Sequence, residues 1–173
     1  IILGAHDWIG ALAANRTILP VVIPASAKFD PKVKAAFQIN RKQYGVPMQT
    51  ENVALFRNTK LVPKAPKTFA ELEKVALALK KKKGKNFVPL AIPQGAGGDA
   101  YHMYPLFSGL GGYFFGGNTL KWNTKDVGVA NAKFIKNSPI IDKWYKEGLI
   151  KASVSADVAK SSFTGGNAAF YVT

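Results

Sequence analysis

The sequence predicts an α/β fold with a mainly parallel sheet. Segments with helical spacing of apolar residues alternate with short apolar runs that are typical of buried strands. Hydrophobic residues make up 47% of the 173 residues and charged residues 20%, so the chain can form a core and is not globally disordered. Every apolar run is too short, or too interrupted by charge, to cross a membrane as a helix.

Helices are predicted where a capping residue precedes an amphipathic stretch. Thr68 and Glu71 form a capping box ahead of residues 69–83, and Gly84 ends that helix. Ser138 before Pro139 indicates a break and a new helix that buries Trp144. Other helices are expected over residues 7–15, 31–39, 99–110, 126–136 and 155–163, with Asp7, Asp30 and Asp126 as caps.

Strands are predicted from apolar runs that turn residues interrupt. Residues 113–117, "YFFGG", are expected to form a short hairpin or loop, and Gly165-Gly166 a turn. The predicted strands cover residues 42–47, 53–58, 86–92 and 167–173.

The chain is strongly basic, with a formal net charge of +14. Nine lysines and two glutamates lie between Lys60 and Lys85, a composition that fits a nucleic-acid-binding module or the solvated face and end of a helix. Only three of the 24 basic residues are arginine and no aromatic residue interrupts the final lysines, which favours the solvated helix. The chain has no cysteine, which excludes disulfides, thiolate metal sites and cysteine nucleophiles.

Residues 93–105, "PQGAGGDAYHMYP", combine glycines with an acid and aromatic rings. Gly95, Gly97 and Ala100 satisfy the spacing of a dinucleotide-binding loop. However, residues 118–122, "NTLKW", contain no acid to hold a ribose, so we predict no nucleotide cofactor. The glycines are instead expected to free the backbone so that the start of the next helix faces a cleft.

Three of the ten acids lie beside residues that suggest a binding role. Asp7 precedes Trp8, Glu51 follows Gln49 and Thr50, and Asp99 lies two residues before Tyr101. Carboxylates beside aromatic rings are typical of sugar sites, where the ring packs on the pyranose and the acid binds hydroxyls. A glycan-acting enzyme using two of these acids is the alternative.

The remaining candidates have structural interpretations. Trp8 and Tyr101 fit either a core or a binding role, whereas Tyr104 is expected in the core. His6 and His102 suggest neither a hydrolase triad nor a zinc site. Four helical acids are expected to balance surface lysines: Glu71, Glu73, Asp142 and Glu147.

Residues 44–72, "YGVPMQTENVALFRNTKLVPKAPKTFAEL", resemble a segment of maltose- and maltodextrin-binding proteins, the extracytoplasmic sugar receptors of ABC importers. Further stretches resemble the family in the same order, and together they cover nearly the whole chain: "AHDWIG", "DAYHMYPLFSGLGGYFF", "KDVGVANA" and "GGNAAFYVT".

The resemblance implies a two-lobed, class II periplasmic-binding-protein fold that clamps its ligand by hinge closure. It assigns residues 1–50 to a segment of lobe 1, and residues 51–173 to the hinge crossing and the main part of lobe 2. The chain starts and stops abruptly, with "IIL" and "NAAFYVT", so we interpret it as part of a longer receptor. Its first residues do not resemble a signal peptide.

The resemblance also implies the function and the site. Asp7 is expected to bind sugar hydroxyls from lobe 1, Glu51 from the hinge side, and Tyr101 to stack on a pyranose with Asp99 near its hydroxyls. Where the family often has tryptophan and arginine this chain has Gly4 and Trp8, so the aromatic ring has moved. We therefore expect a non-catalytic receptor for malto-oligosaccharides, periplasmic or a cell-surface lipoprotein, that works with the rest of the receptor and a membrane permease and binds no nucleic acid.

Overall fold

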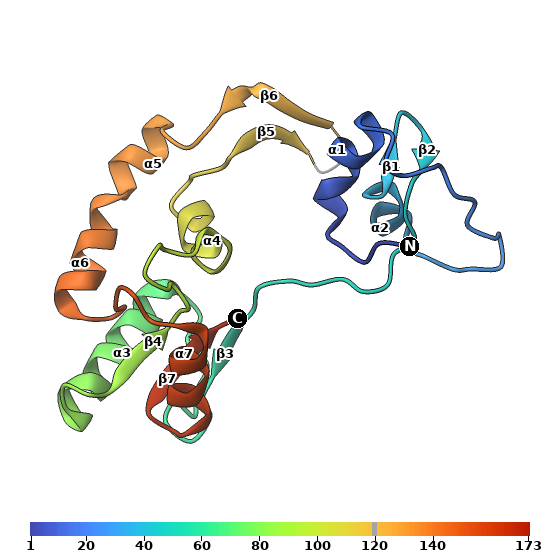
Figure 1. Cartoon of the computed structure of the whole chain (residues 1–173). Coiled ribbons are helices and arrows are strands. Elements are labelled where there is room, and N and C mark those ends of the chain that lie inside the picture. The colour runs from blue at the N-terminus through green and yellow to red at the C-terminus, as the bar shows by residue number, and fades with distance from the viewer. Residues whose placement is uncertain (119–120) are drawn as a thin grey trace. The chain divides into compact units, whose positions relative to one another are not determined.

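The computed structural model describes residues 1–118 and 121–173, and the chain divides into two compact units (Figure 1). The first unit contains Ile1–Asn52 and Gly117–Asn123, and the second contains Val53–Gly116 and Thr124–Thr173. Within the described ranges, no helix is both long and apolar enough to span a bilayer. Helices and strands are mixed in the chain, as an α/β fold requires.

A three-stranded sheet forms the centre of the second unit, in the order β3–β7–β4. β4 and β7 run parallel, with Leu90 opposite Phe170, whereas β3 runs antiparallel to β7, with Phe56 opposite Tyr171. The sheet is therefore mixed, and the prediction of a mainly parallel sheet holds for only one of its two pairings. The strands are β3 (Leu55–Arg57), β4 (Val88–Ala91) and β7 (Ala168–Val172).

The antiparallel pairing continues beyond the strands. The backbone amides and carbonyls of Ala54 and Thr173 exchange hydrogen bonds of 2.7 and 3.1 Å. An antiparallel strand at the edge of a sheet does not need a crossover helix. The alternation of helices and strands in the sequence therefore does not reveal the direction of β3.

Helices cover both faces of this sheet (Figure 1). On one face, Leu72 of α3 (Phe69–Lys83) joins a core cluster with Leu90. On the other face, Ala159 of α7 (Ala156–Thr164) packs in a second cluster with Tyr171. β7 lies between the two layers and is buried along its whole length, which explains why its sequence is a continuous apolar run.

The ends of α3 follow the sequence prediction. The Thr68 hydroxyl accepts a 3.2 Å hydrogen bond from the Glu71 amide, and Gly84 ends the helix with a φ of +94°. The Glu71 carboxylate accepts from the Lys67 amide at 2.7 Å instead of from the Thr68 amide. The capping box is therefore formed, with its return bond shifted by one residue.

The helix that starts at Pro139 anchors the other side of the core. α6 (Pro139–Glu147) buries Trp144, as predicted, and the Trp144 indole donates to the Glu73 carboxylate at 3.3 Å. Lys143 also donates to Glu73, at 2.5 Å, and this hydrogen bond raises the pKa of Lys143. Glu73 therefore balances an exposed lysine, as predicted, and in addition joins α3 to α6.

The helix predicted from Asp126 to Lys136 starts later than expected. Residues Lys121–Val127 form strand β6, which pairs with β5 (Phe115–Asn118). α5 (Ala132–Asn137) begins after Asn131, whose side chain caps it by accepting from the amides of Lys133 and Phe134. Asp126 is not a cap: its carboxylate accepts a 2.8 Å hydrogen bond from the Tyr113 hydroxyl and raises the pKa of that phenol.

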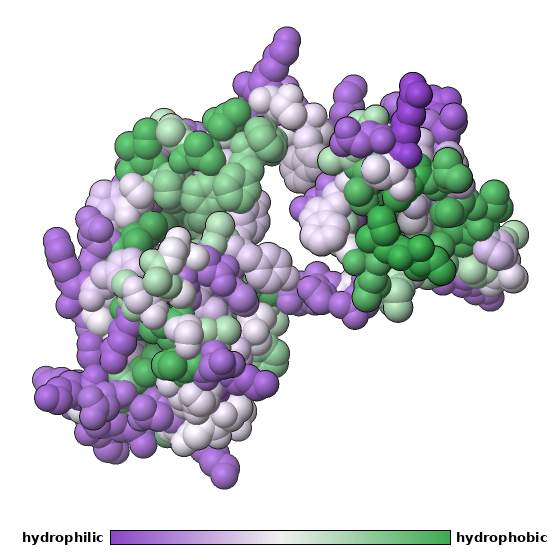
Figure 2. Space-filling model, in the orientation of Figure 1, coloured by the Kyte–Doolittle hydropathy of each residue, from purple (hydrophilic) through white to green (hydrophobic). Residues whose placement is uncertain are grey.

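The first unit consists of short elements with a small interior. Ile9 and Pro47 are buried, and Asp30 caps its helix as predicted by accepting from the Lys32 amide at 2.7 Å. Figure 2 shows extensive hydrophobic surface on this unit, which includes Ile2, Leu3, Leu19, Val22 and Met48. The elements are η1 (His6–Trp8), α1 (Ile9–Ala14), α2 (Pro31–Ala35), β1 (Gln38–Ile39) and β2 (Lys42–Gln43), the last two paired antiparallel.

Candidate functional site

The glycine segment connects β4 to α4 (Ala100–Gly109) and is fixed at its start by Gln94. The buried Gln94 side chain accepts from the Tyr145 hydroxyl at 2.6 Å and donates to the Lys151 carbonyl at 3.1 Å. Gly95 and Gly98 have φ values of +58° and +82°, a region that side chains with a Cβ rarely adopt. The glycines therefore allow the turn that leads into α4.

Asp99 caps α4 and is tied to His102 at both carboxylate oxygens. Oδ1 accepts from the His102 amide at 3.0 Å, and Oδ2 lies 2.6 Å from Nδ1 of the His102 ring. Partial burial works against ionisation of the Asp99 carboxyl, but these hydrogen bonds outweigh it and hold the pKa below its usual value of 3.8. Asp99 is therefore an ionised cap that orients the imidazole.

This cap also bears on the nucleotide hypothesis. A dinucleotide loop places phosphate at the amides of the first helical turn. Here the His102 amide in that turn already binds the Asp99 carboxylate, whose negative charge would repel a phosphate. The start of α4 is therefore poorly suited to a phosphate, and the absence of a nucleotide cofactor stays a prediction.

Aromatic rings surround the exposed side of α4. Tyr101 is 53% exposed and meets the His102 ring edge-on at a centroid distance of 5.2 Å. Tyr104 is 40% exposed and stacks on Phe114 at 5.6 Å, so its predicted place in the core was wrong. Phe114 lies just before β5, and no spacing pattern in the sequence indicates that its ring stacks on Tyr104. Together these side chains form an exposed aromatic surface beside the Asp99–His102 pair.

In the first unit, Asp7 and Trp8 lie in the short 3-10 helix η1. The predicted capping role of Asp7 was wrong, since η1 begins after Ala5 and the Asp7 carboxylate accepts no hydrogen bond from the residues that the structure describes. Trp8 is 52% exposed, and its ring packs against Gly4: a Cβ added to Gly4 would lie 2.6 Å from Trp8 Cε3. The Trp8 ring thus occupies the space into which a side chain at position 4 would project.

Glu51 is exposed and lies in the extended segment between β2 and β3. Its carboxylate accepts a 2.7 Å hydrogen bond from the Gln49 side chain. This local bond leaves the second carboxylate oxygen of Glu51 without a protein partner in the described part of the chain.

The structure brings the candidates together in two groups. Asp99, Tyr101 and His102 form one group in the second unit, and Asp7 with Trp8 forms another in the first unit, which also contains Glu51. A cleft shared by the two groups stays a prediction. His102 and the stacked pair of Tyr104 and Phe114 were not identified as site candidates from the sequence. The i, i+3 spacing of Asp99 and His102 at a helix start could have indicated His102.

The described residues of the site offer groups that can bind a polar ligand. Among residues 1–118 and 121–173, the structure places no three His, Cys, Asp or Glu side chains where they could hold a metal ion. The second unit presents aromatic faces, an imidazole and a carboxylate, groups that bind hydroxyls and apolar ring faces.

Comparison with known proteins identifies similar sequences. The chain is 30% identical to the maltodextrin-binding protein MdxE of Bacillus subtilis (strain 168), over 98% of this chain and 41% of that protein. It is 29% identical to the maltooligosaccharide ABC transporter solute-binding lipoprotein of Streptococcus pneumoniae (strain ATCC BAA-255 / R6), over 98% and 40%. It is 32% identical to the galactooligosaccharide-binding protein of Bacillus subtilis, over 78% and 32%. The chain spans about two fifths of the length of the first two relatives.

A protein-family model matches the full length of this chain. The bacterial extracellular solute-binding protein model matches residues 1–173. This match covers both units and both groups of candidate residues. The chain therefore belongs to the bacterial extracellular solute-binding protein family.

Proposed function

We propose that the chain is part of a non-catalytic receptor that binds malto-oligosaccharides and delivers them to an ABC importer. The main observation in support is that the exposed ring of Tyr101 lies beside an ionised Asp99 and an oriented His102 at the start of α4. An exposed aromatic face next to hydroxyl-binding groups matches the two surfaces of a pyranose. Two of the relatives are named as a maltodextrin-binding protein and a maltooligosaccharide solute-binding lipoprotein, and these names support malto-oligosaccharides as the ligand class.

In this proposal the two units represent the two lobes of a clamp. Residues 1–50 contribute a segment of lobe 1 with Asp7 and Trp8, and residues 51–173 contribute the hinge crossing and the main part of lobe 2. Gly117–Asn123 are the part that this assignment does not match, since the structure groups them with the first unit. The boundary between the units, after Asn52, lies close to Glu51 and supports a hinge there. The rest of the receptor would cover the apolar surface of the first unit, since exposed patches of this kind usually mark an interface.

The contact pattern assigns different roles to the candidates. Tyr101 and Trp8 would stack on sugar rings, and Asp7 and Glu51 would accept hydrogen bonds from hydroxyls. Asp99 would act through His102, because both of its oxygens already face that residue. The Nε2 atom of His102 makes no hydrogen bond to any described residue and would be the atom offered to the sugar.

The remaining parts of the proposal concern location and partners. The matched family is described as extracellular, and one relative is named as a lipoprotein. We infer an extracytoplasmic receptor, periplasmic or anchored at the cell surface, with a membrane permease as its partner.

Calorimetry on the full-length receptor tests this function. Maltose, maltotriose and galacto-oligosaccharides are titrated in parallel, and the reducing ends are measured after a long incubation. Binding of the malto-oligosaccharides without new reducing ends is expected. Stronger binding of galacto-oligosaccharides would change the ligand class, and new reducing ends would favour the glycan-acting enzyme. Absence of binding to every sugar would refute the proposal.

A further inference from the structure

The end of α3 carries four exposed lysines without an acidic partner. Lys81, Lys82, Lys83 and Lys85, here named the lysine platform, form no ion pair or hydrogen bond through their ammonium groups within the described part of the chain. Lys83 only approaches the face of the buried Phe87 ring, at 6.0 Å. The platform is part of the second unit and does not include any of the candidate sugar residues.

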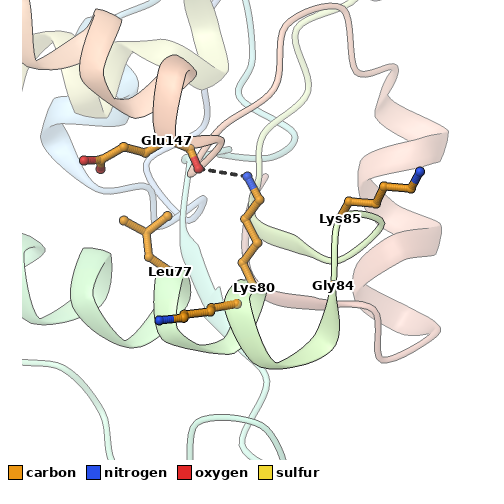
Figure 3. Close-up of a pocket in the computed structure, with 6 residues that line it drawn as sticks. Leu77, Lys80, Gly84, Lys85 and Glu147 are labelled. Carbon is orange, nitrogen blue, oxygen red and sulfur yellow. Dashed lines mark hydrogen bonds between the residues drawn. The ribbon is translucent and has the colours of Figure 1, made fainter.

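The neighbouring Lys80 has a structural role that sets it apart from the platform. Its ammonium donates to the carbonyls of Glu147 and Gly148 at 2.8 and 3.2 Å and so caps the end of α6 (Figure 3). The Glu147 carboxylate points away from Lys80 in Figure 3 and lies 3.8 Å from Lys143. The end of α3 is thereby fixed to α6, and this acid does not neutralise the platform.

An open hollow of about 500 Å³ lies between these two helix ends (Figure 3). The hollow is too open to enclose a small molecule. Two platform lysines, Lys81 and Lys85, line it and are exposed to solvent. Its lining residues are Leu77, Lys80, Lys81, Gly84, Lys85 and Glu147.

Folding stability alone does not require this many lysines. One or two cations in the last helical turn interact favourably with the helix dipole. Further lysines add repulsion between like charges, as for Lys80 and Lys83, which lie three residues apart in the last turn of α3. The platform therefore clusters more positive charge than stabilises the helix, and an external anion can neutralise this charge.

The residue types indicate the kind of anion. Nucleic-acid surfaces combine arginines with exposed aromatic rings, and the platform has neither, because Phe87 is 1% exposed. Clusters of lysines on a helix end are instead attracted to the diffuse negative charge of anionic lipid headgroups. We propose that the lysine platform docks on an anionic bilayer surface. The choice of lipid over nucleic acid rests on the lack of arginine and of exposed aromatic rings in the platform, and sugar recognition is not involved.

Vesicle sedimentation with two charge-matched variants tests this docking. The platform variant carries Lys81→Gln, Lys82→Gln, Lys83→Gln and Lys85→Gln. The control variant carries Lys60→Gln, Lys64→Gln, Lys67→Gln and Lys136→Gln, at exposed positions elsewhere in the second unit. Both variants remove four of the 24 basic charges, so their net charge is equal. Acyl-free protein is mixed with phosphatidylglycerol–phosphatidylcholine vesicles or with pure phosphatidylcholine vesicles.

The expected result is salt-sensitive binding to the phosphatidylglycerol vesicles only, weakened about tenfold or more in the platform variant and much less in the control. Equal weakening in both variants would show a net-charge effect and overturn the proposal, as would absence of binding to anionic vesicles. Platform-dependent binding to DNA that exceeds binding to vesicles would overturn the choice of lipid. Circular dichroism of both variants verifies that the fold is kept, and sugar calorimetry on the same samples tests the receptor function separately.

Discussion

Nδ1 of His102 lies 2.6 Å from Oδ2 of Asp99, while the other oxygen of Asp99 caps the helix at the His102 amide. An ionised carboxylate accepts hydrogen bonds only, so this contact fixes the proton of the neutral imidazole on Nδ1 and leaves Nε2 as an acceptor.

Replacement of Asp99 by asparagine is expected to lower stability in a pH-dependent way. The folded pKa of Asp99 is below 3.8, so its charge stabilises the fold above about pH 4, and this contribution is lost as the pH falls through the folded pKa. Asp99→Asn keeps a capping oxygen but removes the charge, at a cost of up to about 1 kcal/mol near pH 7.

Urea unfolding of wild type and Asp99→Asn from about pH 7 to about pH 3 measures this difference, which is expected to shrink with falling pH. Asp99→Ala, which also removes the cap, is the comparison and is expected to cost more near neutral pH. A difference that stays constant over the whole pH range would contradict the charge contribution.

Replacement of Tyr101 by alanine is expected to weaken sugar binding by about 1–3 kcal/mol, because an exposed stacking surface is lost. Tyr101→Phe keeps the ring and is expected to retain most of the affinity. Tyr104→Ala is the matched control: this tyrosine lies one turn along the same helix, and its ring is occupied by stacking on Phe114. Calorimetry that found equal losses for Tyr101→Ala and Tyr104→Ala would remove the special role of Tyr101.

A methyl group at position 4 is expected to displace the Trp8 ring. The Cβ of Gly4→Ala would lie 2.6 Å from Trp8 Cε3, closer than carbon atoms approach without movement. We expect altered Trp8 fluorescence and weaker sugar binding, with the emission of Gly4→Ala compared with that of wild type, because Trp122 and Trp144 are unchanged in both. Gly10→Ala, which meets nothing within 4 Å, is the control. Unchanged emission in Gly4→Ala would show that the ring does not pack on Gly4.

Loss of the Glu73 carboxylate is expected to destabilise the second unit by about 1–3 kcal/mol, because the indole N–H of Trp144 would lose its acceptor. Trp144 is 2% exposed, so water cannot easily replace the carboxylate. Glu73→Gln keeps an acceptor and is expected to cost less than Glu73→Ala, and Asp142→Ala on the exposed side of α6 is expected to cost little. Denaturant unfolding followed by tryptophan fluorescence compares the three variants, and equal stability of all three would exclude a role for this bond.

Short-range sequence signals were enough to predict the local features of this chain. The cap at Thr68, the stop at Gly84, the restart at Pro139 and the buried strand at the end of the chain all follow from short-range preferences, and all are present. Such features depend on backbone groups within a few residues, so a single segment contains the information needed to predict them.

The pairings between distant segments are visible only in the folded chain. Three contacts join residues whose spacing in the sequence has no periodic pattern. They are the antiparallel pairing of β3 with β7, the hydrogen bond between Trp144 and Glu73, and the stacking of Tyr104 on Phe114. Asp126 shows the same effect, since a hydrogen bond from Tyr113 accompanies a strand where local capping preference indicated a helix start. Packing and hydrogen bonds to remote partners outweigh local propensity because each contributes as much free energy as a cap or more.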